Sequence, residues 1–216
     1  MFKKHKWTLL FGSAIILLPI LAGLLLWDRL PEQIPTHWGV NGEPDGWSSK
    51  AAAVFALPAV LLVVHWVCIL VTHMDPRNGN QGKKIMGLML WICPVLSVLL
   101  GCLSFGSALG WEPNINMILP LFMGILFVAI GNYLPKCAWS YTVGIRIPWT
   151  LDSEENWNAT HRFAGKIWVG GGLLMLVCAF LPEIWSVIAL VGIMLVITIV
   201  PMIYSWRFYR KEKENQ

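Results

Sequence analysis

Long apolar segments separated by shorter polar ones dominate the chain. Five of them carry no Asp, Glu, Lys or Arg, and each is close to the ~20 residues that a helix needs to cross the ~30 Å hydrocarbon core of a membrane. They are 7–27, 51–71, 85–109, 117–134 and 185–206. A further segment, 163–181, is long enough if Lys166 extends its side chain to the headgroups. The pattern predicts an all-α, polytopic protein with six transmembrane helices in a single membrane domain, residues 1–216.

The charge distribution predicts the orientation of these helices. The chain is 56% hydrophobic and only 13% charged, whereas soluble domains are typically about 25% charged. With both termini on one side, that side holds fourteen of the 16 Lys and Arg residues, and only Arg29 and Lys50 fall on the other. The positive-inside rule therefore places both termini in the cytoplasm. Because topology explains the net charge of +4, we expect the lipid bilayer as a partner and no direct contact with nucleic acid.

Prolines, glycines and tryptophans in the predicted spans indicate how the helices pack. Membrane helices tolerate proline where neighbouring groups satisfy the carbonyl that it frees, so we expect kinks within a packed bundle. The prolines are Pro19, Pro58, Pro94, Pro120 and Pro201. Gly165 and residues 170–172 would let the backbone of another helix approach closely. Trp168 and six other tryptophans lie at predicted span ends, as in an interfacial belt.

Few polar side chains fall within the predicted spans. His65 lies near the middle of the second span and Asn132 near the inner end of the fourth. Such residues are functional candidates, but a proton-coupled transporter or an ion pump needs a relay of ionisable groups. The apolar runs contain no Asp, Glu, Lys or Arg, which argues against that class. We expect His65 to be neutral and hydrogen-bonded to a neighbouring helix.

The outer loop, residues 28–50, is rich in turn signals. The stretch Asn-Gly-Glu-Pro-Asp-Gly at 41–46 favours tight turns, because Gly and Asn accept positive φ and Pro presets the first turn position. Ser48 or Ser49 is a candidate N-cap for the second span. We expect this loop to form a compact, rigid cap on the membrane surface, suited to recognition or sealing.

The inner loop, residues 135–166, ends in a helical pattern. Asp152 followed by Glu155 resembles a capping box with Asp152 at the N-cap. From Ser153 onward the spacing predicts an amphipathic helix along the inner membrane surface that runs into the fifth span. Its first face comprises Trp157, His161, Ala164 and Trp168. Its polar face comprises Glu154, Asn158 and Arg162.

Histidines and carboxylates in the two loops leave a metal site or an enzyme as an alternative. The two sets are His37, Glu43 and Asp45 in the outer loop, and Glu154, Glu155 and His161 in the inner loop. Neither set has the spacing of a known metal-ligand motif, and the chain contains no H-E-x-x-H, G-x-S-x-G or Walker motif. We therefore expect no enzymatic activity, no metal and no cofactor.

Two segments together resemble a known family. The first, PEQIPTHWGVNGEPDGWSSK, resembles the P-x-H-W-x-x-x-G-x-x-D loop of a widespread group of bacterial membrane proteins. The second, GNYLPKCAWSYTVGIRIPWTLDSEENWNATHRFAGKIWVGGG, resembles the G-N-Y-x-P … G-I-R-x-P-W-T-L … E-x-W-x-x-T-H-R-x-x-G-K signature of the SdpI-type immunity proteins. The second match is long and specific, whereas the first is shared more broadly. The resemblance extends over nearly the whole chain.

This resemblance implies a multi-pass protein of the bacterial plasma membrane. Its type member protects a toxin-producing bacterium from its own secreted, membrane-active peptide, and it also holds a small helix-turn-helix repressor at the membrane. By resemblance, the extracellular residues that face the toxin are His37, Trp38, Gly42, Asp45 and Trp47. The cytoplasmic residues for signalling or docking are Arg146, Pro148, Trp149, Thr150, Glu154, Trp157, Thr160, His161, Arg162 and Lys166.

Two other functions stay open from the sequence. A small exporter or flippase could use the proline-containing spans as hinges, but its polar path would have only His65 and Asn132. A membrane metalloenzyme would have to be built on His37 or His161 with nearby carboxylates.

Overall fold

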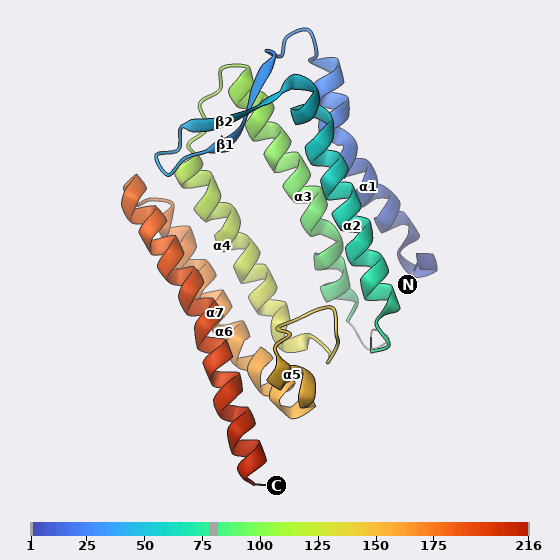
Figure 1. The fold of residues 1–216 in the computed structure, drawn as a ribbon, viewed down its shortest axis with the longest axis vertical. Coiled ribbons are helices and arrows are strands. Elements are labelled where there is room, and N and C mark those ends of the chain that lie inside the picture. The colour runs from blue at the N-terminus through green and yellow to red at the C-terminus, as the bar shows by residue number, and fades with distance from the viewer. Residues whose placement is uncertain (1, 78–81, 216) are drawn as a thin grey trace. The chain divides into compact units, whose positions relative to one another are not determined.

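Seven α-helices and one β-hairpin make up the part of the chain that the computed structural model describes, residues 2–77 and 82–215 (Figure 1). The helices are α1 (Phe2–Leu25), α2 (Leu57–Met74), α3 (Lys83–Ala108), α4 (Ile115–Tyr133), α5 (Pro148–Asp152), α6 (Glu154–Cys178) and α7 (Glu183–Glu214). The strands are β1 (Gln33–Trp38) and β2 (Pro44–Ser49). A π-helical turn, Ala52–Ala56, precedes α2, and a 3₁₀ turn, Leu134–Lys136, follows α4. The all-α prediction is confirmed.

Five stretches among the described residues are long and apolar enough to cross a membrane. They are Lys6–Leu25, Ala52–Met74, Lys84–Ala108, Ile115–Lys136 and Glu183–Glu214. These stretches fit a multi-pass plasma-membrane protein and match five of the predicted spans to within a few residues, except that α7 continues well beyond residue 206. The predicted fifth span, 163–181, is occupied by the second half of α6, which is not among the five stretches. The six-span count and the cytoplasmic termini stay predictions.

The chain divides into two compact units. The first comprises the residues up to His73 together with Gly87–Ile115, and the second comprises Met74–Met86 and the residues from Asn116 onward. The first unit therefore holds α1, the hairpin, α2 and most of α3. The second holds α4 to α7 and the loop that precedes α5.

In the first unit, an antiparallel hairpin connects α1 to α2. Gln33 pairs with Ser49 and Trp38 with Pro44, and the register is irregular around His37. We predicted a compact, turn-rich cap from its turn signals and made no prediction of strands there; proline and glycine are in general poor strand formers. The cap is instead a paired ribbon, and one reason is that Ile34 is completely buried and fixes the face that β1 turns inward.

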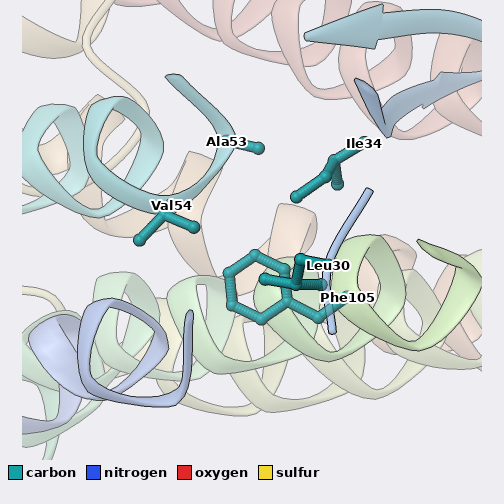
Figure 2. Close-up of a cluster of buried hydrophobic side chains, with 5 residues drawn as sticks. All are labelled: Leu30, Ile34, Ala53, Val54 and Phe105. Atoms are coloured by element: carbon teal, nitrogen blue, oxygen red, sulfur yellow. The ribbon is translucent and has the colours of Figure 1, made fainter. Parts of the chain in front are cut away.

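The hairpin is fixed to the helices by a small apolar core. Figure 2 shows its five buried side chains. They come from the segment between α1 and β1, from β1 itself, from the turn before α2, and from α3. They are Leu30, Ile34, Ala53, Val54 and Phe105. Gly23 of α1 lies so close to the Val54 side chain that an added Cβ would stand 2.7 Å from its methyl groups. Ser49 accepts a hydrogen bond from the Ala52 N–H, as expected of one of the two candidate caps.

In the second unit, α4 and α6 contact each other backbone to backbone at two levels. A Cβ on Gly124 would stand 2.8 Å from the Gly172 carbonyl, and a Cβ on Gly131 would stand 3.0 Å from the Gly165 carbonyl. Only glycine permits such an approach. The predicted close packing at Gly165 and Gly172 is thus confirmed, whereas Gly170 has no atom within 4 Å of its Cβ position.

Trp168 is not an interfacial anchor, so that part of the predicted belt is wrong. Its indole N–H donates to the carbonyl of Ile197 at 2.9 Å. This is the carbonyl that Pro201 leaves without a helical donor, because it lies four residues before the proline. The ring also packs on Phe127, with a centroid distance of 5.0 Å. Trp168 therefore joins α4, α6 and α7 within the second unit.

The glycine contacts give a direct test of this packing. Gly172→Leu should destabilise the protein by about 3 kcal/mol, because the new side chain must push α4 away from α6. Gly170→Leu is the matched control on the same helix and should change the unfolding midpoint little. Thermal unfolding of both variants in detergent micelles measures the difference. An equal loss in the two variants would contradict the backbone contact.

Candidate functional site

The predicted extracellular residues lie on or next to the hairpin. His37 Nδ1 and Asp45 Oδ1 lie 2.5 Å apart, and both side chains are largely exposed. Gly46 faces His37 across the strands, and a Cβ there would stand 2.9 Å from the His37 Cβ. The absence of a side chain at Gly46 thus makes room for the His37–Asp45 pair.

The tip of the hairpin is a closed turn. Gly42 has φ +77° and its N–H donates to the Gly39 carbonyl, so glycine is required at this position. The side-chain amide of Asn41 donates to the Glu43 carboxylate at 2.8 Å, and the Asn41 side-chain oxygen accepts from the Glu43 backbone N–H. The Glu43 carboxylate is therefore engaged within the turn. No group of three or more His, Cys, Asp or Glu residues suited to a metal occurs among residues 2–77 and 82–215.

The base of the hairpin is held by Lys50. Its ammonium group donates to the Trp27 carbonyl at 3.2 Å, lies 2.9 Å from Glu32, and lies 5.3 Å from the centroid of the Trp27 ring. The Lys50 side chain is buried, whereas the Glu32 side chain is exposed to solvent, which weakens the ion pair. Lys50 thereby joins the end of β2 to the end of α1.

A cavity of about 220 Å³ lies between the hairpin and the helices of the first unit. Thr36, Trp38 and Ser48 line it from the hairpin, while Ser97 and Ser104 line it from α3. The hydroxyl oxygens of Thr36 and Ser48 lie 3.0 Å apart, within hydrogen-bond distance. Trp38 is thus half-buried over this cavity, whereas Trp47 is 55% exposed on the hairpin surface.

The predicted intramembrane residue His65 is buried in the first unit. Its Nε2 has no hydrogen-bond partner among the described residues, so the expected hydrogen bond to a neighbouring helix is not made through this atom. The Nε2 atom lies 3.6 Å from the position that a Cβ on Gly12 would occupy.

The loop formed by residues 137–147, here called the signature loop, folds around two buried side chains of α6. Trp157 donates its indole N–H to the Cys137 carbonyl at 2.9 Å, and its ring stacks on that of His161 with centroids 4.0 Å apart. Gly144 has φ +128°, and a Cβ there would stand 2.5 Å from His161 Nε2. Glycine is therefore required at position 144 for two reasons: the backbone has a positive φ, and a side chain would clash with His161.

His161 is a neutral hydrogen-bonding link between α6 and this loop. Its Nδ1 lies 2.8 Å from the Trp157 carbonyl, which can only accept, so Nδ1 carries the proton. Its Nε2 accepts from the Ile145 N–H at 2.9 Å. Burial lowers the pKa of His161 to about 4, although the hydrogen bond to Trp157 opposes this shift. In the same cluster, burial raises the pKa of the Cys137 thiol to about 11, so that group stays protonated.

Thr150 and Trp139 close the other side of the signature loop. The Thr150 hydroxyl accepts from the Ile147 N–H at 3.1 Å and lies 2.8 Å from the Ile145 carbonyl. The Trp139 indole N–H donates to the Thr150 carbonyl at 3.1 Å. The loop thus has no regular secondary structure but is held by side-chain hydrogen bonds.

The expected cap at Asp152 is wrong. Helix α6 begins at Glu154 with Ser153 as its N-cap, whose hydroxyl accepts from the Asn156 N–H at 3.1 Å. Asp152 ends α5 instead and accepts from the Tyr209 hydroxyl at 2.8 Å. The serine hydroxyl, one residue later, is the group that reaches the first turn of α6.

A buried amide network joins α6 to the far end of α7. Asn156 donates to the Ser205 carbonyl at 3.0 Å, and its oxygen accepts from the hydroxyls of Thr160 and Ser205, both at 2.8 Å. All three side chains are completely buried. Each polar atom of the Asn156 amide therefore has a partner, as a buried network requires.

The ten predicted cytoplasmic residues differ in burial. Thr150, Trp157, Thr160 and His161 are buried and act in packing. Arg146, Pro148, Glu154, Arg162 and Lys166 are exposed, and Trp149 is half-buried. The amphipathic pattern of α6 is confirmed, because Glu154, Asn158 and Arg162 are all exposed. Sequence reasoning missed Asp75, Arg77, Gly144 and Asn156, and of these only the Asp-Pro pair at 75–76 gave a local turn signal.

Asp75 connects the end of α2 to the signature loop. Its carboxylate accepts from the Arg77 N–H at 2.9 Å, the Tyr141 N–H at 2.8 Å and the Thr142 hydroxyl at 2.8 Å. Burial raises the pKa of this carboxyl, but the hydrogen bonds outweigh that effect and hold the pKa below its usual value.

The low pKa of His161 predicts a loss of stability in mild acid. An unfolded histidine has a pKa of about 6.5, so protons bind the unfolded state more readily and stability falls as the pH drops below that value. Between pH 7.5 and pH 5 this effect should cost about 2 kcal/mol. Denaturant unfolding at the two pH values should show this loss in the wild type and a smaller one in His161→Gln. The same pH dependence in both proteins would contradict it, since the variant keeps every other titrating group.

Two family models match the chain, one within each of its two compact units. Residues 136–205 match the SdpI/YfhL protein family, and they cover the signature loop, α5, α6 and most of α7. Residues 14–62 match a domain of unknown function, DUF1648, and they cover the second half of α1, the hairpin and the start of α2. No solved structure matches the chain.

Two relatives share sequence with the chain. The "Immunity protein SdpI" of Bacillus subtilis (strain 168) is 27% identical over 197 residues, which cover 91% of this chain and 93% of the relative. An uncharacterized protein of Archaeoglobus fulgidus is 34% identical over 84 residues, which cover 36% of this chain and 45% of that protein. The signature loop and α6 thus lie within the segment that matches the SdpI/YfhL family model, and the similarity to the Bacillus subtilis immunity protein extends over most of both chains.

Proposed function

We propose that this chain is a membrane immunity protein that gives resistance to a secreted, membrane-active peptide toxin. The observation that carries the proposal is the similarity to an immunity protein over 91% of this chain and 93% of the relative. An alignment of that extent includes both the hairpin and the signature loop, so it does not rest on one shared motif.

In this proposal the hairpin is the extracellular recognition surface. His37, Asp45 and Trp47 are exposed on it, together with Val40 near its tip. Its backbone is held at the base by Lys50 and Ile34 and at the tip by the turn around Gly42. Exposed aromatic and apolar side chains on a rigid frame suit recognition of an apolar peptide, because little ordering is needed upon binding.

The direct test is protection from killing. Toxin-sensitive bacteria that express the chain should survive challenge with the peptide secreted by a strain that carries an SdpI-type relative, whereas cells with an empty vector should die. Unchanged killing at a confirmed membrane level of the protein would overturn the proposal.

The hairpin surface can be tested separately. Trp47→Ala should lower the half-lethal toxin concentration about tenfold, since an exposed aromatic contact of ~1.4 kcal/mol or more would be lost. Trp7→Ala is the matched control, because Trp7 is also exposed but lies at the predicted cytoplasmic end of α1. If the two variants protect equally well, the hairpin is not the recognition surface.

We also propose that the exposed cytoplasmic residues form a docking surface for a small helix-turn-helix repressor. Glu154, Asn158 and Arg162 form a continuous polar stripe at the start of α6, next to the exposed Lys166. The buried residues of the same segment fix this stripe in place, so its charges are available to a partner.

Reversing one charge on this stripe should separate signalling from protection. Arg162→Glu should abolish toxin-dependent co-sedimentation of the repressor with membranes and leave survival unchanged, whereas Arg162→Lys should retain both. Retention of the repressor by Arg162→Glu would exclude this stripe as the docking surface.

A further inference from the structure

Arg77 contacts two aromatic rings of the signature loop. Its guanidinium carbon lies 3.4 Å from the centroid of the Trp139 ring and 4.2 Å from that of the Tyr141 ring. Such contacts hold the flat guanidinium group in a fixed orientation and offset part of the cost of burying it. The side chain is half-buried, so part of it stays open to the surroundings.

The charge of Arg77 is not neutralised within the part of the chain that the structure describes. None of the ion pairs found there includes Arg77. The nearest carboxylate in sequence, Asp75, is occupied by three neutral donors from Arg77, Tyr141 and Thr142. In addition, Arg77 Nη1 is buried without a hydrogen-bond partner among residues 2–77 and 82–215. A buried N–H of a cation without an acceptor is costly unless a bound group supplies one.

A second guanidinium group is attached to the same tyrosine. Arg146 Nη1 donates to the Tyr141 carbonyl at 3.1 Å, while Arg77 lies against the Tyr141 ring. Arg146 is exposed. Two permanent positive charges therefore lie against Tyr141. Asp75, which is already occupied, is the carboxylate that hydrogen-bonds to this part of the loop.

The position of this pair in the chain indicates which anion it meets. Arg77 follows the last residue of α2, Met74, by three positions, and α2 is one of the five stretches that can cross a membrane. Met74 is 79% exposed, so the apolar surface of the helix continues to its end. Arg77 thus lies where hydrocarbon gives way to headgroups, which is the level of lipid phosphates. Guanidinium groups bind phosphate oxygens with two parallel hydrogen bonds.

We propose that Arg77 and Arg146 form a binding site for the phosphate of an anionic phospholipid, with Trp139 and Tyr141 as its aromatic wall. Two positive charges with one occupied carboxylate favour a headgroup of net negative charge over a zwitterionic one. The lipid phosphate supplies acceptors for the guanidinium N–H groups and ties the signature loop to the membrane surface. This site goes beyond the proposed immunity function and does not depend on it.

Thermal unfolding of the purified full-length protein in mixed micelles tests the site. Phosphatidylglycerol should raise the unfolding midpoint in a concentration-dependent way, because a ligand that binds only the folded state stabilises it. Phosphatidylcholine at the same concentration should raise it much less, and inorganic phosphate at millimolar concentration should not reproduce the shift. Native mass spectrometry of the same samples should show retained phosphatidylglycerol.

Variants assign the shift to this site. Arg77→Gln should remove most of the phosphatidylglycerol-dependent shift, whereas Arg162→Gln, which removes an exposed charge from α6, should retain it. Should Arg77→Gln fail to fold, Arg146→Gln serves instead, because that side chain is exposed; it should weaken lipid binding about tenfold. An equal shift in the wild type and both site variants would overturn the proposal. Equal stabilisation by both lipids, or the same stabilisation by inorganic phosphate alone, would overturn it as well.

Discussion

A carbonyl that loses its helical donor inside a membrane must find another one within the protein, and the packing of the second unit follows from this constraint. Pro201 frees the Ile197 carbonyl, and the Trp168 indole satisfies it at 2.9 Å. The indole reaches that position because the glycine contacts bring α4 and α6 backbone to backbone, which leaves the ring between Phe127 and α7. In the first unit, Ser97 of α3 also donates to a carbonyl of a proline-containing helix, that of Ile16 in α1, at 2.7 Å.

The signature loop must also pair its buried backbone groups, although it forms neither a helix nor a strand. Its buried N–H and carbonyl groups are paired with side chains, among them Trp157 on the Cys137 carbonyl and His161 on the Ile145 N–H. His161 must stay neutral to do this, because a protonated Nε2 could no longer accept. Trp157 and His161, two buried members of the signature on α6, are therefore structural, and the exposed members are the ones that can reach a partner.

The periodicity of the sequence predicted the features that depend on spacing within one segment. It did not predict the features that depend on a contact with a residue far away in the sequence. The five apolar stretches and the exposed polar face of α6 follow from repeats within one segment. The hairpin was missed because its proline and glycine residues disfavour strands, and the burial of Ile34 against Phe105 of α3, which fixes its inward face, is invisible in a single sequence. Asp75 gave no functional signal either, since its partners Tyr141 and Thr142 lie more than sixty positions away.

A protein that neutralises a peptide by binding it needs a surface that cannot rearrange to hide its apolar groups. The hairpin has this property, because Lys50 and Ile34 fix its base and the Asn41–Glu43 contacts close its tip. Trp47 and Val40 are therefore held in an exposed position by the backbone beneath them. A flexible loop of the same composition would turn these side chains into the lipid surface and would have to be reordered for each encounter, at a cost in affinity. The rigidity of the hairpin is thus the feature that makes recognition a better explanation for this segment than a simple covering role.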